Sequence, residues 1–360
     1  MIFLLRPLKK LISFLLVPGS SQFLFGNDRH DDFKNKTVDY VIIPPFFVNT
    51  CDDVHKLLID IRALCHDRTR IIFILNIFGS RFSPKDIWNF LIVGNYDLIT
   101  RGRFHFFRYF IARPLFFQQP DTTVSVIVPI RNEKKNIASI IQRVPSLGSD
   151  TEIVFVEGGS TDGTREECER LIQTSDRKCK LILQSGDGKG NAVKEAIYAA
   201  SHDVIVILDA DLVIPPEELI YFYETLLSGE AEFLNSSRLV YPMEPGAMPL
   251  LNRLGNRFFG WLYSWLLGEK LKDLFGGTKM FRKSDYIKID RLRPYFQSGD
   301  QWGDVDMFFG AAKLYLKLQD VPVHYYARLH GISHMRRYSY AWFLVKAFLR
   351  GYRKLKPGLF

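Results

Sequence analysis

Apolar runs and helical periods change character near residue 120. Before that point, two apolar runs that we interpret as buried strands enclose one segment of helical spacing, at residues 38–44, 51–64 and 70–77. The stretch 79–119 is rich in Phe and Arg but shows no clean period, and residues 113–120 have the composition of a linker. We therefore expect a small α/β appendage over residues 1–120.

Beyond residue 120, apolar strands and amphipathic helices alternate. The expected strands lie at residues 124–129, 152–157, 180–184 and 204–208. The expected helices between them lie at residues 134–144, 164–174 and 190–201. Alternation of this kind predicts a mostly parallel sheet that is covered by helices on both faces. Ligands of such sheets bind beyond the carboxyl ends of the strands.

Chemically active side chains follow these strands directly. Arg131 to Glu133 come after the first strand, a turn at 157–163 follows the second, and Asp209 and Asp211 end the fourth. Two carboxylates on one turn can each offer an oxygen to Mg²⁺ or Mn²⁺, which prefer such ligands. A metal there would stabilise negative charge on a departing phosphate as a Lewis acid.

Two further loops open helices. In the 157–163 turn, glycines permit close approach to a flat base, and Glu157 can accept hydrogen bonds from a uracil or guanine N–H. The alternative is a capped turn with Ser160, Thr161 or Asp162 as the N-cap. At 186–191, backbone amides and the Lys189 side chain can face phosphate.

As an ordered set, these motifs resemble family 2 glycosyltransferases. The resemblance rests on VSVIVPIRNE at 124–133, GSTDG at 159–163, GKGN at 188–191, DAD at 209–211, Ser237-Arg238 and the segment 321–333. It implies a GT-A fold over residues 121–335, and the branch it resembles is the polyprenyl (dolichol) phosphate sugar transferases. The implied reaction is inverting transfer from a UDP- or GDP-sugar, with Mg²⁺ or Mn²⁺, to a polyprenyl phosphate or another envelope glycan or lipid acceptor.

The resemblance also assigns roles to residues. Those implied for the nucleotide-sugar are Pro129, Arg131, Glu133, Glu157, Asp162, Lys189, Asp209 and Arg328. Those implied for the metal are Asp209 and Asp211. Those implied for the acceptor are Arg238, Arg253, Asp273 and Lys279. Relatives usually have Asp in place of Glu157, Arg in place of Lys279 and Ser in place of Gly276.

The catalytic carboxylate of inverting members falls at Asp304 or Asp306, and counting back from the segment 321–322 favours Asp306. A hydroxyl acceptor needs such a base, because its proton must leave as the bond forms, whereas a phosphate acceptor does not. After the 321–323 strand, His330 and His334 are interpreted as locally packed residues in preference to metal ligands.

The N-terminal strands resemble the carboxy-proximal half of a class I methyltransferase. No glycine-rich strand–turn–helix is present there to cradle S-adenosylmethionine. We interpret residues 1–120 as a degenerate remnant used for packing or membrane contact. Cys51, Cys65, Cys168 and Cys179 lack paired spacing, so neither a zinc site nor a disulfide framework is indicated.

The net charge of +9 is concentrated at the two ends of the chain. No acidic residue follows Asp320, and basic residues there are interleaved with aromatic ones. That composition favours a basic amphipathic helix over 336–360 on an anionic membrane, with a solvated tail as the alternative and no nucleic-acid partner. No run approaches the roughly 18 apolar residues of a spanning helix. We expect a cytoplasmic protein, peripheral at the inner face of the plasma membrane.

Two other functions stay open on the sequence alone. A noncatalytic nucleotide-sugar-binding scaffold would keep the loops without transfer, although the acidic residues argue against it. A nucleotidyltransferase would use a similar sheet and release pyrophosphate.

Overall fold

The computed structural model describes residues 122–244, 246–328 and 337–356. Before them it describes residues 8, 11–13, 15–16, 20, 22–24, 38–45, 61–62, 65, 68–76, 83–93 and 95–115. The chain forms two compact units. The first comprises Met1–Phe117, Lys313–Tyr315 and Arg353–Phe360, and the second comprises Gln118–Ala312 and Leu316–Tyr352.

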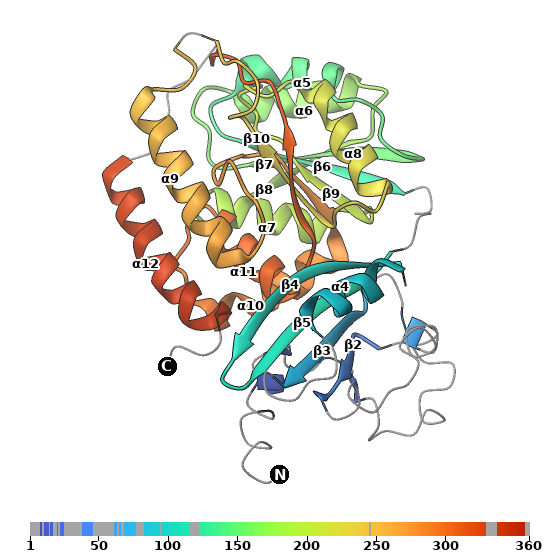
Figure 1. The fold of residues 1–360 in the computed structure, drawn as a ribbon. Helices are drawn as coiled ribbons and strands as arrows, with labels where there is room; N and C mark the ends of the chain where they lie inside the picture. Colours follow the sequence, from blue (N-terminus) through green and yellow to red (C-terminus); the bar gives the residue numbers. More distant parts are fainter. Residues whose placement is uncertain are drawn as a thin grey trace. The chain divides into compact units, whose positions relative to one another are not determined.

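The first unit is built on a five-stranded sheet of order β1-β2-β3-β5-β4 (Figure 1). Its strands are β1 (Gln22–Leu24), β2 (Tyr40–Ile43), β3 (Arg70–Asn76), β4 (Tyr96–Phe104) and β5 (Phe107–Pro114). The strands expected at 38–44 and 70–77 are thus present as β2 and β3. They pair in parallel, whereas β5 runs antiparallel to both β3 and β4. Most of the helix expected at 51–64 lies outside the described residues.

The stretch that lacked a clean period is structured at residues 83–93 and 95–115, which are its described part. It forms helix α4 (Pro84–Val93) and the β4–β5 hairpin. Every residue of β5 except Arg108 is buried, and a register shift between Leu98 and Thr100 interrupts β4, so neither strand alternates cleanly. The linker interpretation was wrong for Arg113, which pairs with Asp97 (3.2 Å) inside the hairpin.

The second unit contains a seven-stranded sheet of order β12-β10-β11-β9-β6-β7-β8. The strands predicted from the sequence are β6 (Thr123–Ile130), β7 (Asp150–Glu157), β8 (Cys179–Leu183) and β9 (Val204–Ile207), all mutually parallel where they pair. The remaining strands are β10 (Phe233–Ser237), β11 (Lys279–Arg282) and β12 (Leu318–Pro322). Because only β11 runs antiparallel to its neighbours, the prediction of a mostly parallel sheet is confirmed.

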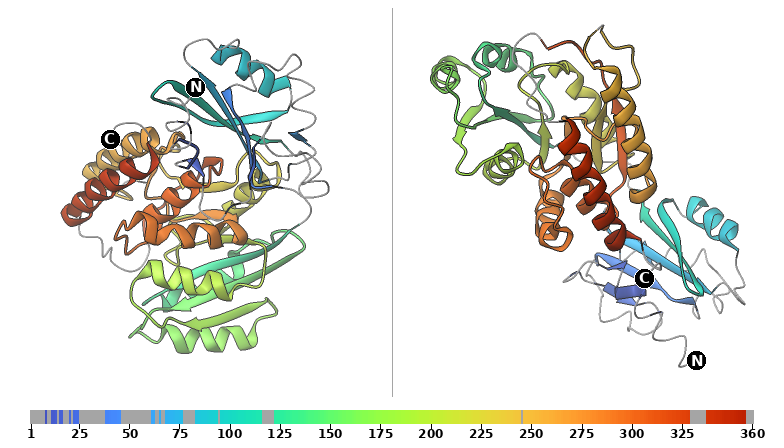
Figure 2. Two further views of the ribbon diagram at one scale, coloured as in Figure 1. Left: turned by 90° about the horizontal axis from the view of Figure 1, so that it is seen from below. Right: turned by 90° about the vertical axis from the view of Figure 1, so that its left-hand side faces the viewer.

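Helices cover both faces of this sheet (Figures 1 and 2). They are α5 (Ile137–Arg143) after the short turn η2 (Lys134–Asn136), α6 (Thr164–Thr174), α7 (Lys189–Ala199) and α8 (Leu219–Leu227) after η3 (Pro216–Glu218). The later helices are α9 (Leu250–Leu267), α10 (Lys283–Phe296), α11 (Asp304–Lys313) and α12 (Arg337–Leu355).

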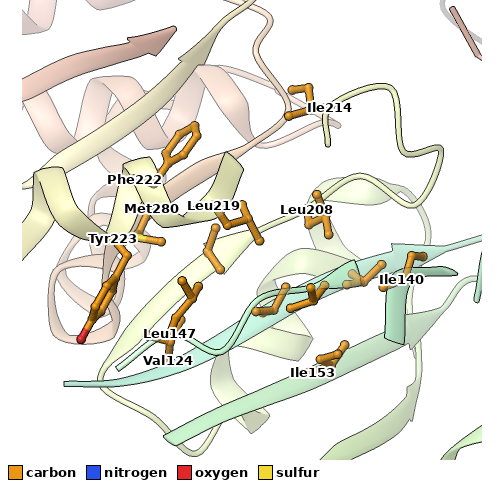
Figure 3. Close-up of a cluster of buried hydrophobic side chains, with 14 of the residues drawn as sticks. Val124, Ile140, Leu147, Ile153, Leu208, Ile214, Leu219, Phe222, Tyr223 and Met280 are labelled. Carbon is orange, nitrogen blue, oxygen red and sulfur yellow. The ribbon is translucent and has the colours of Figure 1, made fainter. Parts of the chain in front are cut away.

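The core follows from the alternation of side chains along the strands. In β6, Val124, Val126, Val128 and Ile130 belong to one cluster with apolar residues of α5, α6 and α8. Figure 3 shows part of this cluster, in which Ile140 of α5 and Phe222 of α8 approach the sheet. Helix α7 packs against β6 and β7. Buried on both faces, the central strands hold their carboxyl ends at fixed positions.

Candidate active site

The loops that follow β6 and β7 are hydrogen-bonded to each other. The backbone amide of Asn132 donates to Ser160 Oγ (3.0 Å), and the amide of Thr161 donates to Asn132 Oδ1 (2.8 Å). Asn132 is left-handed (φ 57°), a conformation that asparagine adopts more readily than most residues. Residues 131–133 and 157–163 therefore form one rim at the carboxyl edge of the sheet.

The carboxylates of the second loop, at residues 157–163, accept hydrogen bonds from backbone amides of the rim and of the residues next to it. The amide of Ser160 donates to Glu157 Oε1 (2.5 Å), and the amides of Thr164 (3.0 Å) and Lys134 (3.4 Å) donate to Asp162. Burial opposes ionisation of both acids, but these hydrogen bonds keep the pKa of Glu157 and of Asp162 below their ordinary values. Both side chains therefore stay anionic and shape the loop.

Asp209 lies just beyond the end of β9 and faces a lysine. Its Oδ1 accepts a hydrogen bond from Nζ of Lys189, the first residue of α7, at 2.5 Å. Burial opposes ionisation, but the ammonium of Lys189 holds the pKa of Asp209 below its ordinary value. A Cβ at position 277 would lie 1.9 Å from Asp209 Oδ2, so the backbone of Gly277 approaches the carboxylate as only glycine can.

Asp211 faces an arginine that lies 117 positions later in the chain. Its Oδ2 accepts a hydrogen bond from the guanidinium of Arg328, which follows β12, and its Oδ1 accepts one from the amide of Val213 (3.4 Å). Burial and the neighbouring charge of Asp209 raise the pKa of Asp211 in spite of Arg328. Each carboxylate of the pair thus has its own cation.

Glu133 connects the rim to this acidic pair. Asn136 Nδ2 donates to Glu133 Oε2 (2.6 Å). Burial raises the pKa of Glu133, the Asn136 hydrogen bond opposes that rise, and the negative charge of Asp211 adds to it. The electrostatic effect of Asp211 indicates that the loops after β6 and β9 meet in one site.

A third acidic group enters from the start of α11. Lys279, which begins β11, is fully buried, and its Nζ donates to Asp304 Oδ1 (2.7 Å) and to the Gly276 carbonyl (2.5 Å). Burial lowers the pKa of Lys189, but the negative charges of Asp209 and Asp304 together raise it above its ordinary value. Asp304 therefore lies among the cations that face Asp209.

Asp300 caps the same helix end. Its carboxylate accepts hydrogen bonds from the amides of Val305 (2.7 Å) and Trp302 (3.0 Å). Burial, together with the like charge of Asp304, raises the pKa of Asp300 to about 6. The loop is also fixed to α7, because the amide of Gly190 donates to the Gln301 carbonyl (3.1 Å) and a Cβ at position 190 would lie 2.8 Å from that oxygen.

Asp306 belongs to a different cluster. It accepts a hydrogen bond from Ser298 Oγ and pairs with Arg293 Nε (3.4 Å), which is on α10. Burial raises the pKa of Asp306, while Ser298 and Arg293 oppose that rise. Its carboxylate thus joins α10 to α11 and does not contact the acidic pair.

On the acceptor side, Asp273 is the centre of a buried polar network. Arg238 Nε and NH2 donate to its two oxygens at 2.7 and 2.9 Å, and Asn256 Nδ2 donates at 2.6 Å. Although burial works against both charges, ion pairing keeps the pKa of Asp273 low and that of Arg238 high. The network joins the end of β10 to α9 and to the segment that leads into β11.

A known sequence family matches part of the second unit. Residues 125–290 match the sequence family described as "Glycosyl transferase family 2". This part of the chain is therefore similar to family 2 glycosyltransferases. Together with the mostly parallel seven-stranded sheet, the match confirms the GT-A class of fold that the motifs implied.

Individual relatives of the chain include "Glycosyltransferase AglJ" of Haloferax volcanii, 29% identical over 214 residues. That alignment spans 59% of this chain and 65% of AglJ. An undecaprenyl-phosphate 4-deoxy-4-formamido-L-arabinose transferase of Salmonella paratyphi B is 33% identical over 110 residues, which is 29% of this chain and 34% of the transferase. The chain therefore covers less than two thirds of either relative.

Among solved structures, the chain is similar to glucosyl-3-phosphoglycerate synthase of Mycobacterium tuberculosis in complex with Mn²⁺, UDP and glucosyl-3-phosphoglycerate. The sequence identity is 19% and the TM-score is 0.45, over 65% of this chain and 80% of the synthase.

The second unit brings several of the residues predicted for the donor and the metal into one site. Those linked there by hydrogen bonds or by electrostatic effects on pKa are Glu133, Lys189, Asp209, Asp211 and Arg328. Pro129 is half-buried in β6, and Arg131 is exposed beside it. Helix α6 begins after Gly163 as its N-cap, so none of the three residues named as alternative caps occupies that position. His330 and His334 lie outside the described residues.

The predicted acceptor residues are dispersed. Lys279 is buried against Asp304, Arg238 and Asp273 are paired with each other, and Arg253 is exposed on α9. Sequence reasoning missed Asp300 and the close approach of Gly277 to Asp209. The Gly276-Gly277 pair was the available signal, because two adjacent glycines before a strand indicate tight backbone approach.

Proposed function

We propose that this domain transfers a sugar, with inversion, from a UDP- or GDP-sugar to a polyprenyl phosphate or another cell-envelope glycan or lipid. The observation that carries the proposal is the pair Asp209 and Asp211 at the end of a central strand, each paired with a cation from a different part of the chain. The family match supports sugar transfer, and the Salmonella relative supports a polyprenyl phosphate acceptor.

Mg²⁺ or Mn²⁺ fits the chemistry of this pair. Two adjacent carboxylates supply hard oxygen ligands, and Gly277 leaves no side chain over Asp209. No cluster of three or more potential ligands occurs among the residues that the structure describes, so the donor diphosphate and water would complete the coordination. When bound, the ion would supply Lewis-acid stabilisation of the leaving diphosphate.

Lys189 and Arg328 are the cations that we assign to the diphosphate. Lys189 and Arg328 each donate a hydrogen bond to one carboxylate of the acidic pair. Both side chains are long and flexible, so each can turn from its carboxylate to the more highly charged diphosphate. Lys189 stands at the start of α7, where the helix N-terminus also favours negative charge. Glu133, Glu157 and Asp162 keep the rim in shape for the nucleoside.

For the acceptor, we assign the catalytic carboxylate to Asp304 in preference to Asp306. Asp304 lies near Lys189 and Lys279, whereas Asp306 is bound to Ser298 and Arg293. With a hydroxyl acceptor, Asp304 would take the proton that leaves during bond formation. With a phosphate acceptor no base is needed, and the Lys279–Asp304 pair would position the acceptor phosphate.

The experiment is a product assay with undecaprenyl phosphate and a panel of UDP- and GDP-sugars in the presence of Mn²⁺. We expect release of UDP or GDP with formation of a glycolipid, and an Asp211→Ala variant at least about 10²-fold slower. A parallel reaction supplies UTP or GTP with a sugar 1-phosphate, and formation of a UDP- or GDP-sugar with release of pyrophosphate there would identify a nucleotidyltransferase. Binding of donor without any transfer would identify a scaffold, and either result would contradict the proposal.

The rest of the chain is assigned a supporting role. No helix in the described part of the chain is long and apolar enough to cross a bilayer. We propose peripheral attachment at the inner face of the plasma membrane. We also propose that the first unit, with its methyltransferase-like parallel strands β2 and β3, serves for packing or membrane contact and not for catalysis.

A further inference from the structure

The exposed face of α9 is apolar over most of the helix length. Its side chains are 53% to 71% exposed, and after the first pair they follow one another at intervals of three or four residues. They are Leu250, Leu251, Leu254, Phe258, Trp261 and Trp265, which we call the α9 stripe. Residues at such intervals share one side of a helix, and a side that faces water is ordinarily polar.

Charge around the stripe has one sign. Every exposed residue from 250 to 265 is either apolar or arginine, the arginines being Arg253 and Arg257. Residues 245–268 contain no Asp or Glu. Arginine stems can lie along an apolar surface while their guanidinium groups reach outward to phosphate. The composition therefore combines apolar contact with attraction for anions.

Helix α12 lies beside α9 and has the same character (Figures 1 and 2). Trp265 stacks on Tyr352 (centroids 5.6 Å apart), and Tyr263 donates a hydrogen bond to the Leu344 carbonyl (3.0 Å). α12 exposes Trp342 and Leu349, and Lys346 lies over the Trp342 ring (5.4 Å). Residues 337–356 also contain no acid, so both helices expose apolar side chains without any acidic neighbour on the same helix.

We propose that the α9 stripe is a membrane-docking surface that enters the interface of an anionic bilayer. Tryptophan is enriched at that depth, and an interfacial helix combines an apolar face with basic flanks. A protein partner fits less well, because interfaces between proteins carry a polar rim with hydrogen bonds, and the exposed residues of the stripe region include no neutral polar side chain. The surface does not depend on the proposed sugar transfer.

The test uses the full chain in vesicle flotation. Vesicles of phosphatidylcholine alone are compared with vesicles that contain about one third phosphatidylglycerol. We expect the protein to float with the anionic vesicles, and a Leu254→Ser/Trp261→Ser variant to partition at least about tenfold more weakly. Tyr221→Ser is the matched control, because Tyr221 is 55% exposed on α8, outside the stripe. Circular dichroism and thermal melting verify that all variants are folded.

An Arg253→Glu/Arg257→Glu variant separates the contribution of charge to vesicle binding from that of the apolar side chains. It should lose the preference for anionic vesicles. The proposal fails if the Leu254→Ser/Trp261→Ser variant floats as well as the unmodified chain, or if the unmodified chain floats with neither vesicle. It also fails if light scattering shows a dimer that this variant converts to monomers without any vesicle binding, since the stripe would then be a contact between copies of the chain.

Discussion

At the scale of single residues, the site is organised by pairs of opposite charge with different surroundings. Asp209 and Asp211 each meet a cation at the edge of the sheet, where the side chains of Lys189 and Arg328 remain 25% and 34% exposed. Lys279, by contrast, is fully buried against Asp304. Partly exposed pairs can exchange partners at small cost, whereas a buried pair cannot lose one member without leaving an uncompensated charge.

Asp304 and Asp306 are distinguished by their partners, which yields a residue-scale prediction. Asp304→Asn should lower kcat at least about tenfold more than Asp306→Asn, because only Asp304 lies near the cations of the site. Steady-state kinetics with donor and acceptor measure the difference. Melting temperatures are needed for both variants, since Asp304→Asn also leaves Lys279 without its anion. If Asp306→Asn were the slower enzyme with an unchanged fold, the assignment to Asp304 would be wrong.

At the scale of elements, α9 is held to the domain by close backbone contact on one side only. A Cβ at Gly260 would lie 2.9 Å from the Lys272 carbonyl, whereas a Cβ at Gly255, on the same helix, would meet nothing within 4 Å. The buried Asp273 network lies beside this contact, because Asn256 of α9 donates to Asp273. One face of α9 is therefore tightly packed, and the opposite face carries the α9 stripe.

The two glycines of α9 predict opposite effects on stability. Gly260→Ala should destabilise the domain by about 1–3 kcal/mol, because a backbone carbonyl must move to admit the methyl group. Gly255→Ala should stabilise it by about 0.5–1 kcal/mol, because alanine favours the helix and has room there. Denaturant unfolding of the two variants provides the measurement. Equal shifts of the same sign would show that α9 does not pack as described.

The elements also show how far the sequence alone could reach. Strands β6 to β9 were predictable because each is a short apolar run that alternates with an amphipathic helix. Strand β10 is fully buried yet ends in Asn235, Ser236 and Ser237, and Asn235 is held by Asp320 (2.7 Å), a partner that only the fold supplies. The β4–β5 hairpin was missed for a related reason, since β5 is buried on both faces.

In the site, the sequence predicted where the acidic residues follow the strands, but it did not predict which cations they pair with. The acidic pair could be placed from the sequence because it directly follows an apolar strand. The pairing of Asp211 with Arg328 joins residues 117 positions apart, and nothing local indicates it. Likewise, the arginine of the Ser237-Arg238 motif proved to be bound to Asp273, a contact that depends on how the segment between α9 and β11 meets the end of β10.

At the scale of the whole molecule, the residues of the proposed site come from segments spread along the second unit. The loops after β6, β7, β9 and β12, the start of α7 and the start of α11 all contribute side chains or backbone to the same edge of the sheet. Such convergence is typical of parallel sheets, in which loops at the carboxyl ends of the strands share one side. Donor binding should therefore depend on several loops at once and stabilise the unit as a whole.

We propose that Asp209 and Asp211 hold a divalent cation together with the donor diphosphate. Isothermal titration of UDP and GDP, with Mn²⁺ and with EDTA, tests it most directly in the unmodified chain and in Asp211→Asn. We expect that one nucleotide binds only with Mn²⁺, and that Asp211→Asn weakens this binding at least about tenfold. Equal nucleotide affinity with EDTA and in the variant would contradict it.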